Sequence, residues 1–468
     1  MSNNAERSRL LIPIHWRHGR WRSIGGFASS YLQTLRESER IKAPNHVKDT
    51  PAPEWIDCSM DVEGNELTIV DLFCGAGGLS AGFRSAGFKS VMAVDSWSPA
   101  VATYRHNLGD PVLEEYVTSR LGLPHCHVIA GGPPCQGFSS AGLRKSDDER
   151  NSLVSVFANL IAEHKPMAFV FENVEGFLTG ANGKYVLELL DPVINAGYRV
   201  HLRKVNAANF GVPQHRKRVV AIGGLGWSPS FPAFTHSAFG APGAELARVH
   251  TAFTVPTVSE ALSVLPKAVS RSEQGPDEDH NFIPLEGADL QRAELLQPGQ
   301  RMADLPEELW HDSYRKRAFR RVKDGTPTER RGGAPSGVRR LRPDEPSKAI
   351  TGGSLRDFLH PTENRPLTIR ECATLQTFPS TFQLCGSGAD RIQLVGNAVP
   401  PLFALAIAKC LKNDFECLAD REKGPGALLS FVPTLSTGMS PALESTTKQI
   451  QLRFFQKTTK EMQLALWD

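Results

Sequence analysis

The chain has 468 residues, a formal net charge of +3, and 40% hydrophobic residues. This length predicts two or three domains with a large core, and so small a charge does not itself demand a polyanionic partner. Its 8 cysteines form no Cys-x-x-Cys pair and no Cys/His metal spacing, which predicts free thiols in a reducing compartment and no metal site. Without an apolar run of about 18 residues or a signal-peptide pattern, we expect neither a membrane span nor secretion.

The first 66 residues combine a basic and aromatic stretch at 15–22 with a proline-containing stretch at 43–53. This composition predicts a peripheral extension followed by a linker. A nucleic-acid-binding arm is the less favoured alternative, since basic and aromatic residues together suit backbone contact and stacking.

From residue 67, short apolar runs alternate with helical patterns. The runs lie at 67–73, 91–95, 128–130, 168–171 and 219–223, and a helical pattern covers 152–164. Continuous apolar strands separated by helices predict a mostly parallel α/β sheet covered on both faces. The pattern stops after residue 227 and returns near residue 346.

The first apolar run ends in a glycine-rich stretch, 73–80, where missing side chains let the backbone approach a ligand. Asp95 closes the second run, where a carboxylate can accept hydrogen bonds from ribose hydroxyls. The stretch lacks the Gly-Lys-Ser/Thr of a P-loop and the Gly-x-Gly-x-x-Gly spacing. It therefore predicts either a site for a nucleoside-containing cofactor or a tight turn without a ligand.

Cys135 follows two prolines in Pro-Pro-Cys-Gln-Gly-Phe-Ser, just after an apolar run. Proline stiffens the loop, so this thiol is a better candidate nucleophile than an ordinary buried cysteine. Glu172 ends another apolar run and is expected at the same edge of the sheet. Arg216 and Arg218 alternate at the start of a further strand, which predicts that both lie on one face, suited to a carbonyl oxygen or phosphate.

Residues 228–345 hold many prolines, glycines and charges. The densest basic part is 314–323, and more arginines follow at 330–331 and 339–340. Clustered arginine with glycine favours a surface that contacts a polyanion over a merely solvated insertion.

Taken in order, these blocks resemble the DNA (cytosine-5)-methyltransferase family. The resemblance covers 67–227 and about 346–411 and includes Glu-Asn-Val at 172–174, Gln-x-Arg-x-Arg at 214–218, the stretch 370–379, and Gly-Asn-Ala-Val-Pro-Pro at 396–401. Each block is weak alone, but their shared order argues strongly against a chance match.

The resemblance implies a Rossmann-like S-adenosylmethionine-dependent methyltransferase sheet in residues 67–227 and 346–415. It further implies a smaller irregular target-recognition domain in 228–345, between an N-terminal extension (1–66) and a C-terminal tail (416–468). The implied cofactor is S-adenosyl-L-methionine. The implied cofactor-binding residues are Phe73, Gly75, Ala76, Gly77, Gly78, Leu79, Asp95, Pro134, Leu153, Asn397, Ala398 and Val399.

The resemblance also implies a catalytic set. Cys135 would attack C6 of a cytosine flipped out of the duplex, and Glu172 would hydrogen-bond the ring N3 and the exocyclic amine. Arg216 and Arg218 would orient the base oxygen and the loop that carries Cys135. The expected DNA contacts are Gln136, Ser139, Gln214, Arg317, Arg320, Arg321 and Arg331.

This chain departs from the family pattern at several positions. Asp95 stands where the family usually has Glu, Ser96 where it often has a bulky residue, and His127 where it has Asp. The acidic residue that meets the adenine amine in the family has no clear counterpart between residues 110 and 118.

We therefore expect a monomeric, cytoplasmic bacterial enzyme that methylates C5 of cytosine in a specific double-stranded DNA sequence. The expected partner is a cognate restriction endonuclease, and no membrane contact is expected. Methylation of transfer RNA is an alternative that the long insertion disfavours. A non-catalytic DNA-binding relative is disfavoured because Cys135, Glu172 and both arginines are present, and the glycine spacing disfavours a nicotinamide-dependent oxidoreductase.

Overall fold

The computed structural model describes residues 66–109, 111–134, 152–237, 253–273, 275–315, 337–435 and 438–455, all within one compact unit, Val47–Asp468. Its main sheet is built from β1 (Thr68–Leu72), β2 (Lys89–Asp95), β3 (Val112–Glu114), β4 (Val128–Gly131), β5 (Ala168–Asn173), β6 (Tyr198–Asn206), β8 (Lys217–Leu225) and β16 (Ala427–Val432). The helices around it are α2 (Gly78–Ser85), α3 (Ser98–Leu108), α4 (Leu153–His164), α5 (Lys184–Asn195), α12 (Pro401–Glu416) and α13 (Pro441–Phe454).

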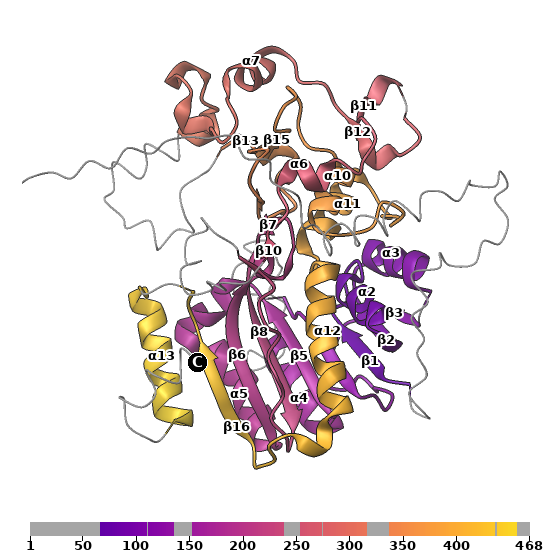
Figure 1. Cartoon of the computed structure of the whole chain (residues 1–468), viewed down its shortest axis with the longest axis vertical. Coiled ribbons are helices and arrows are strands. Elements are labelled where there is room, and N and C mark those ends of the chain that lie inside the picture. The colour runs from indigo at the N-terminus through magenta and orange to yellow at the C-terminus, as the bar shows by residue number, and fades with distance from the viewer. Residues whose placement is uncertain are drawn as a thin grey trace, which may run out of the picture. The chain divides into compact units, whose positions relative to one another are not determined.

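In the described part of the chain the sheet has 8 strands, in the order β16-β6-β8-β5-β4-β1-β2-β3 (Figure 1). β8 runs antiparallel to both β5 and β6, whereas the other neighbouring pairs are parallel. The predicted mostly parallel α/β sheet is confirmed. Parallel strands place their carboxyl ends at one edge, so the loops after β1, β2, β4 and β5 all leave the sheet on the same side.

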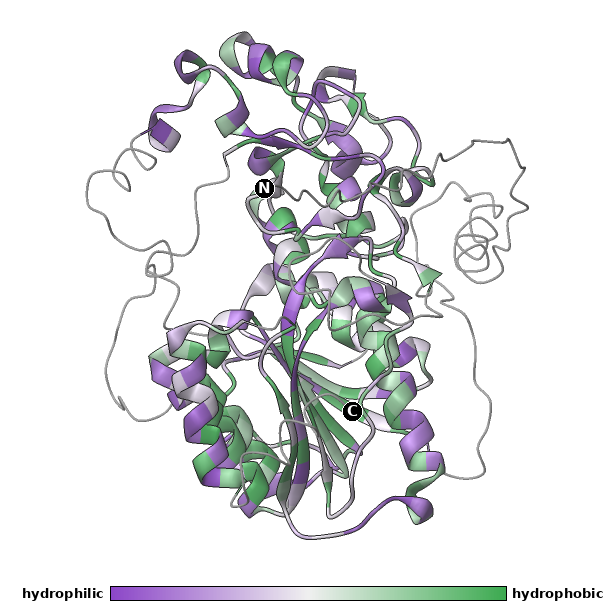
Figure 2. Ribbon diagram, turned by 60° about the vertical axis from the view of Figure 1, so that its left-hand side comes forward, coloured by the Kyte–Doolittle hydropathy of each residue, from purple (hydrophilic) through white to green (hydrophobic). Residues whose placement is uncertain are grey.

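Helices cover both faces of the sheet, which explains why its strands are continuously apolar. Successive residues of β1 face opposite sides: Ile69 packs in the core formed with α2 and α12, whereas Val70 packs in the core formed with α4 and α5. In β5, Val170 likewise packs in the core formed with α2 and α12, and Phe169 packs in the core formed with α4 and α5. Figure 2 shows hydrophobic strands at the centre of the sheet and helices with mixed hydropathy around them.

The segment after α12 adds a strand and a helix that the sequence analysis missed. β16 pairs in parallel with β6 and forms an edge of the sheet. α13 buries Leu443, Thr446, Thr447 and Ile450, a spacing of three and four residues that marks one helical face. Two of these four are threonines, so an apolar pattern alone did not reveal the helix.

Between β8 and the last part of the chain, the described residues form short elements. They are β9 (His236–Ser237), β10 (Phe253–Thr254), α6 (Val258–Leu262), β11 (Val269–Ser270), β12 (Asn281–Phe282), α7 (Gly287–Leu295), β13 (Arg339–Arg340), β14 (Ser347–Lys348), α9 (Ser354–Asp357) and β15 (Phe358–Leu359). Two further helices, α10 (Ile369–Leu375) and α11 (Gly388–Asn397), lead back to α12, and β7 (Gln214–His215) precedes β8. The irregular texture expected for this part is therefore observed in the described residues.

One helical stretch in the described part of the chain, Gly388–Glu416, is long and apolar enough by composition to span a bilayer. Within the fold, 61% of its most apolar window is buried. It comprises α11 and α12, and residues of α12 pack against the sheet with α2. Burial of this kind is typical of a core helix.

A half-buried histidine links β6 to β16. His201 Nε2 lies 3.0 Å from the Pro229 carbonyl oxygen, so it must donate, and Nδ1 then accepts from the Ser430 hydroxyl at 2.7 Å. Arg203 Nε donates to the same hydroxyl oxygen at 2.9 Å. Burial, with a smaller effect of Arg203, lowers the pKa of His201 from 6.5 to about 4. The neutral imidazole is therefore the form that this strand pairing requires.

This link makes stability depend on pH in a defined window. Between pH 6.5 and about 4 the unfolded chain binds a proton at His201 that the folded protein does not, so stability falls as pH falls, by up to about 3 kcal/mol. Urea unfolding at several pH values should show a flatter dependence for His201→Gln than for the parent protein. The control is His106→Gln, on the exposed surface of α3. Equal slopes for the parent and His201→Gln would contradict the assignment.

Candidate active site at the carboxyl edge of the sheet

The glycine-rich loop turns β1 sharply into α2. Phe73, Gly75 and Gly77 have φ values of 60°, 54° and 85°, the left-handed region, which is costly for Phe73 and natural for glycine. A Cβ on Gly78 would lie 2.2 Å from the Val399 carbonyl oxygen, so only glycine allows this approach. A Cβ on Gly75 would meet no atom within 4 Å. The loop therefore packs against Val399 at Gly78 and faces open space at Gly75.

Asp95 holds the same loop through backbone amides. Its Oδ2 accepts from the Gly75 N–H at 2.9 Å, and its Oδ1 accepts from the Trp97 N–H at 2.9 Å. Each carboxylate oxygen has a further lone pair, which leaves capacity for a hydroxyl donor. The donor and acceptor chemistry of the loop thus fits a ribose diol.

An acidic residue lies next to Asp95 that the sequence analysis did not identify. β3 pairs with β2 so that Glu114 stands opposite Asp95, and the Glu115 N–H donates to the Asp95 carbonyl at 3.1 Å. The Glu114 carboxylate accepts from the Ser98 hydroxyl. β3 has only 3 residues, too few for a periodicity signal, so the position of Glu114 emerges only from strand pairing.

Glu172 and Arg218 form an ion pair inside the sheet edge. Arg218 Nε lies 2.8 Å from Glu172 Oε1, and the side chains are 13% and 10% exposed. The two groups are in ion contact without the alignment of a hydrogen bond. The pair forms because β8 runs antiparallel beside β5, with Glu172 opposite Val220. Two strands that are distant in sequence thus bring opposite charges together in a poorly solvated position, where their attraction is strengthened.

The prolines before Cys135 are tied to the same strand end. The Asn173 side-chain amide donates to the Pro133 carbonyl at 2.8 Å. A Cβ on Gly132 would lie 3.3 Å from Glu172 Oε2, so the chain passes close to the carboxylate. Pro134 is exposed. The chain therefore enters the predicted nucleophile loop directly beside Glu172.

Arg216 differs from Arg218 in its partners. Its side chain is 1% exposed, and it donates to the carbonyl oxygens of Ile350, Gly396 and Ala398 at 2.7–2.9 Å. Strand alternation predicted that both arginines lie on one face. Arg216 lies in the step between β7 and β8, and its N–H bonds to the Gln214 carbonyl, so the alternation rule does not apply there.

Gln214 was predicted to contact DNA, and its surroundings contradict this. Its side chain is 0% exposed. The amide nitrogen donates to the Leu375 carbonyl and to Gln376 Oε1, both at 2.8 Å, and its oxygen accepts from the Ile350 N–H at 3.0 Å. Every polar atom of the side chain is used inside the protein, because β7 is covered by the end of α10.

The remaining predicted residues divide between described and undescribed parts. Leu153 begins α4, and residues 397–399 connect α11 to α12. Cys135, Gln136, Ser139, Arg317, Arg320, Arg321 and Arg331 lie outside the described residues.

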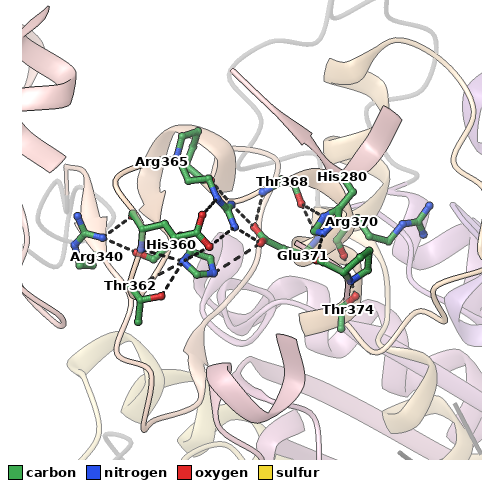
Figure 3. Close-up of polar contacts among 12 residues, drawn as sticks. His280, Arg340, His360, Thr362, Arg365, Thr368, Arg370, Glu371 and Thr374 are labelled. Atoms are coloured by element: carbon green, nitrogen blue, oxygen red, sulfur yellow. Dashed lines mark hydrogen bonds and ion pairs between the residues drawn. The ribbon is translucent and has the colours of Figure 1, made fainter. Parts of the chain in front are cut away.

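A second cluster joins α10 to the irregular segment. Arg365 and Glu371 are 4% and 3% exposed and form a bidentate pair at 2.7 and 2.9 Å. Glu371 also accepts from the Thr368 N–H, completing the capping box of α10. The Thr368 hydroxyl contacts His280 Nδ1 at 3.0 Å. Figure 3 shows this network, which extends to His360 and Arg340 on one side and Arg370 on the other.

Arg340 and Arg370 extend the cluster along the irregular segment. Arg340 donates to the carbonyls of Ala293 and Leu296, at the end of α7 and just beyond it, and to carbonyls at 360 and 363. Arg370 Nε donates to Asp277 Oδ2 at 2.7 Å. α10 is thereby bonded to residues of the irregular segment and, through Leu375 and Gln376, to Gln214 of β7, the strand just before the one that carries Arg218.

Comparisons with known proteins identify the family. The sequence profile for C-5 cytosine-specific DNA methylase matches residues 67–413. Type II methyltransferase M1.HphI of Haemophilus parahaemolyticus is 34% identical over 358 residues, covering 74% of this chain and 86% of the relative. Type II methyltransferase M.AgeI of Thalassovita gelatinovora is 32% identical over 425 residues, covering 74% and 99%.

A solved structure agrees in fold. A prophage-encoded E. coli protein, described as a candidate DNA modification methyltransferase, superposes with a TM-score of 0.54 at 24% identity, covering 75% of this chain and 99% of that one. The chain belongs to the C-5 cytosine-specific DNA methylase family and is a C5 cytosine DNA methyltransferase. The family match ends at residue 413, before β16 and α13.

The buried pair of Arg365 and Glu371 predicts a large stability effect. Glu371→Gln would leave the Arg365 guanidinium without its bidentate carboxylate, and we expect the free energy of unfolding to fall by about 3–5 kcal/mol. Urea unfolding measures this. Lys89→Ala, in an exposed pair with Glu66 (57% and 59% exposed), is the control and should cost less than about 1 kcal/mol. Similar losses for the two variants would refute the prediction.

Proposed function

We propose that this protein is a modification methyltransferase of a Type II restriction–modification system, which methylates C5 of one cytosine in a specific double-stranded DNA sequence. The observation that carries the proposal is the buried pair of Glu172 and Arg218 beside the Gly132–Pro133 backbone that leads to Cys135. The names of the relatives, Type II methyltransferases, support the system type. The proposed partner is a cognate endonuclease, against which methylation protects host DNA, and the proposed state is a monomer.

We propose S-adenosyl-L-methionine as the cofactor, which when bound supplies the electrophilic methyl group. Asp95 would accept hydrogen bonds from the ribose, with Glu114 next to it as the acceptor for the adenine amine. Phe73 and the glycine loop would lie along the cofactor, and Val399, in contact with Gly78, would close it. The further cofactor-site residues are Ala76, Leu79, Pro134, Leu153, Asn397 and Ala398.

In the proposed chemistry, the target cytosine leaves the base stack because its ring carbons are unreachable within it. The Cys135 thiolate forms a bond to C6, and the displaced electron pair makes C5 nucleophilic. Glu172 hydrogen-bonds N3 and the exocyclic amine, and Arg218 holds Glu172 and faces the base oxygen. After C5 is methylated, its proton leaves and the Cys135–C6 bond breaks, which restores the thiolate.

We propose that the irregular segment 228–345 forms the target-recognition part, with 67–227 and 346–415 as the catalytic part. The bond from Arg370 to Asp277 attaches this segment to α10, and the bonds from Arg340 to the carbonyls at 360 and 363 attach it to the loop before α10. Arginine-rich surface with glycine suits phosphate and base-edge contact.

A trapping experiment tests the chemistry. Duplex DNA that carries 5-fluorocytosine at the target cytosine, identified by sequencing methylated DNA from expressing cells, should form a covalent adduct with the parent protein and labelled S-adenosylmethionine. The fluorine cannot leave as a proton does, so the adduct persists on a denaturing gel. Cys135→Ser should form none, and Glu172→Gln should lower methylation by about 10²–10⁴-fold. An adduct with Cys135→Ser would refute the nucleophile, and methylation of transfer RNA instead of DNA would refute the substrate.

Asp95 provides a test of the cofactor site. In Asp95→Asn the amide nitrogen cannot accept a hydrogen bond, so a charged acceptor and one backbone bond to Gly75 or Trp97 are lost. We expect the dissociation constant for S-adenosylhomocysteine, measured by calorimetry, to rise by about tenfold or more. Glu115→Gln, an exposed neighbour, is the matched control and should change it less than about twofold. Equal effects of the two substitutions would rule out a specific role for Asp95.

A further inference from the structure

Arg216 is a fully buried arginine whose guanidinium is bonded to carbonyl oxygens. Among the described residues it is the largest side chain with less than 2% exposure. Its Nη1 donates to the Ile350 carbonyl oxygen at 2.7 Å, and its Nη2 donates to the carbonyl oxygens of Gly396 at 2.8 Å and Ala398 at 2.9 Å. Burial, and then the nearby Arg218, lower the pKa of Arg216, while Glu172 opposes them. A buried charge is costly unless it is well bonded, so these three carbonyls must be held in place.

Two of the three carbonyls belong to the end of α11. The last carbonyls of a helix have no partner within it and carry the negative end of the helix dipole. Here the Val395 carbonyl accepts from the Gln376 amide at 2.6 Å, and Gly396 and Ala398 accept from Arg216. Arg216 therefore caps α11 and fixes the turn that follows it, residues 397–399.

That turn packs directly against the glycine loop. A Cβ on Gly78 would lie 2.2 Å from the Val399 carbonyl and 3.3 Å from the Phe378 ring. Any movement of the turn toward the loop is blocked, and any movement away opens the wall of the proposed cofactor site. The position of the Arg216 side chain thus sets one wall of that site.

On its other side, Arg216 is two residues from Arg218, whose Nε lies 2.8 Å from Glu172 Oε1. The intervening backbone is bonded to β6, where Lys217 pairs with Asn206 and Arg218 with Val205. Displacing the Arg216 backbone would therefore disturb the geometry of the ion pair. One short stretch of backbone carries both the cap of α11 and the partner of Glu172.

We propose that Arg216 is a positioning residue that couples the cofactor wall to the Glu172–Arg218 pair, so that binding of the cofactor and of target DNA strengthen each other. The proposal rests on the proposed function for the identity of both ligands. Coupling of this kind must be reciprocal, with each ligand changing the affinity of the other by the same factor. Lysine cannot replace Arg216, because one ammonium group lacks the planar fork that reaches carbonyls on two segments.

The test measures binding rather than turnover. The dissociation constant for S-adenosylhomocysteine is determined by calorimetry without DNA and with a saturating target duplex. We expect the duplex to tighten binding by about 5-fold or more in the parent protein. In Arg216→Lys we expect weaker binding without DNA and a coupling factor below about 2. Parent-like affinity and coupling in a folded Arg216→Lys protein would overturn the proposal.

Arg340→Lys is the matched control. Arg340 is also buried, at 4% exposed, and also donates to backbone carbonyls, but these belong to α7, the residue after it and the 360–364 loop. We expect Arg340→Lys to lower the free energy of unfolding, measured with urea, as Arg216→Lys does. The affinity of Arg340→Lys for S-adenosylhomocysteine without DNA should stay unchanged. If both variants lose that affinity equally, general destabilisation explains the result and the proposal fails.

A second measurement uses the parent protein alone, in case Arg216→Lys does not fold. Hydrogen exchange should show that S-adenosylhomocysteine slows exchange of amides in 214–220 as well as in the turn 396–399. Protection of the turn without protection of 214–220 would overturn the proposal. Failure of the parent to bind S-adenosylhomocysteine or to methylate DNA would instead refute the proposed function, so the two failures are distinguishable.

Discussion

Four segments far from it in sequence are bonded to the backbone or side chains of one short stretch of the chain, Gln214 to Arg218. β14 pairs with β7, and Gln214 is bonded to Ile350 and to the end of α10. The end of α11 is bonded to Arg216, and Glu172 forms an ion pair with Arg218. Nearly all of these bonds have a backbone partner or are buried. A group that lost its partner here could not bond to water instead. The geometry of the active-site edge depends on this stretch remaining where it is.

α10 connects that stretch to the irregular segment. Its first turn is held by Glu371, Thr368 and Arg365, and its last residues bond to Gln214. Buried ion pairs often contribute little net stability, but they define one arrangement, because any shift leaves a charge unpaired. A helix with fixed bonds at both ends therefore sets the spacing between the irregular segment and β7, which leads into the strand that carries Arg218.

Patterns local to one segment were enough to predict much of the fold. The apolar runs at 67–73, 128–130 and 168–171 correspond to β1, β4 and β5, and α4 lies within the predicted 152–164 helix. The carboxyl-edge position of Glu172 also followed from the order of strands. α13 was missed because two of its four buried positions are threonines, and β16 because its buried residues, Leu428 and Phe431, do not follow the alternation of a strand. β3 was missed because it has only 3 residues.

The candidate site was predicted less completely, since its geometry comes from pairing between distant segments. Nothing near Gln214 or Arg216 in the sequence reveals that α10 and α11 cover them. Their polar character suggested contact with DNA or the base, whereas both side chains are buried. Glu114 was passed over for the same reason, because only its pairing opposite Asp95 distinguishes it from other acidic residues.

The placement of α12 has a consequence for how the protein is made. This helix covers the face of the sheet that contains Ile69, Val128 and Val170, yet the ribosome makes it only after the strands that carry these residues. Until then, the nascent sheet exposes a continuous apolar face, which is prone to association with other chains. The protein is therefore expected to depend on chaperones or slow late docking during synthesis, and premature termination before Pro401 would leave an aggregation-prone fragment rather than a smaller enzyme.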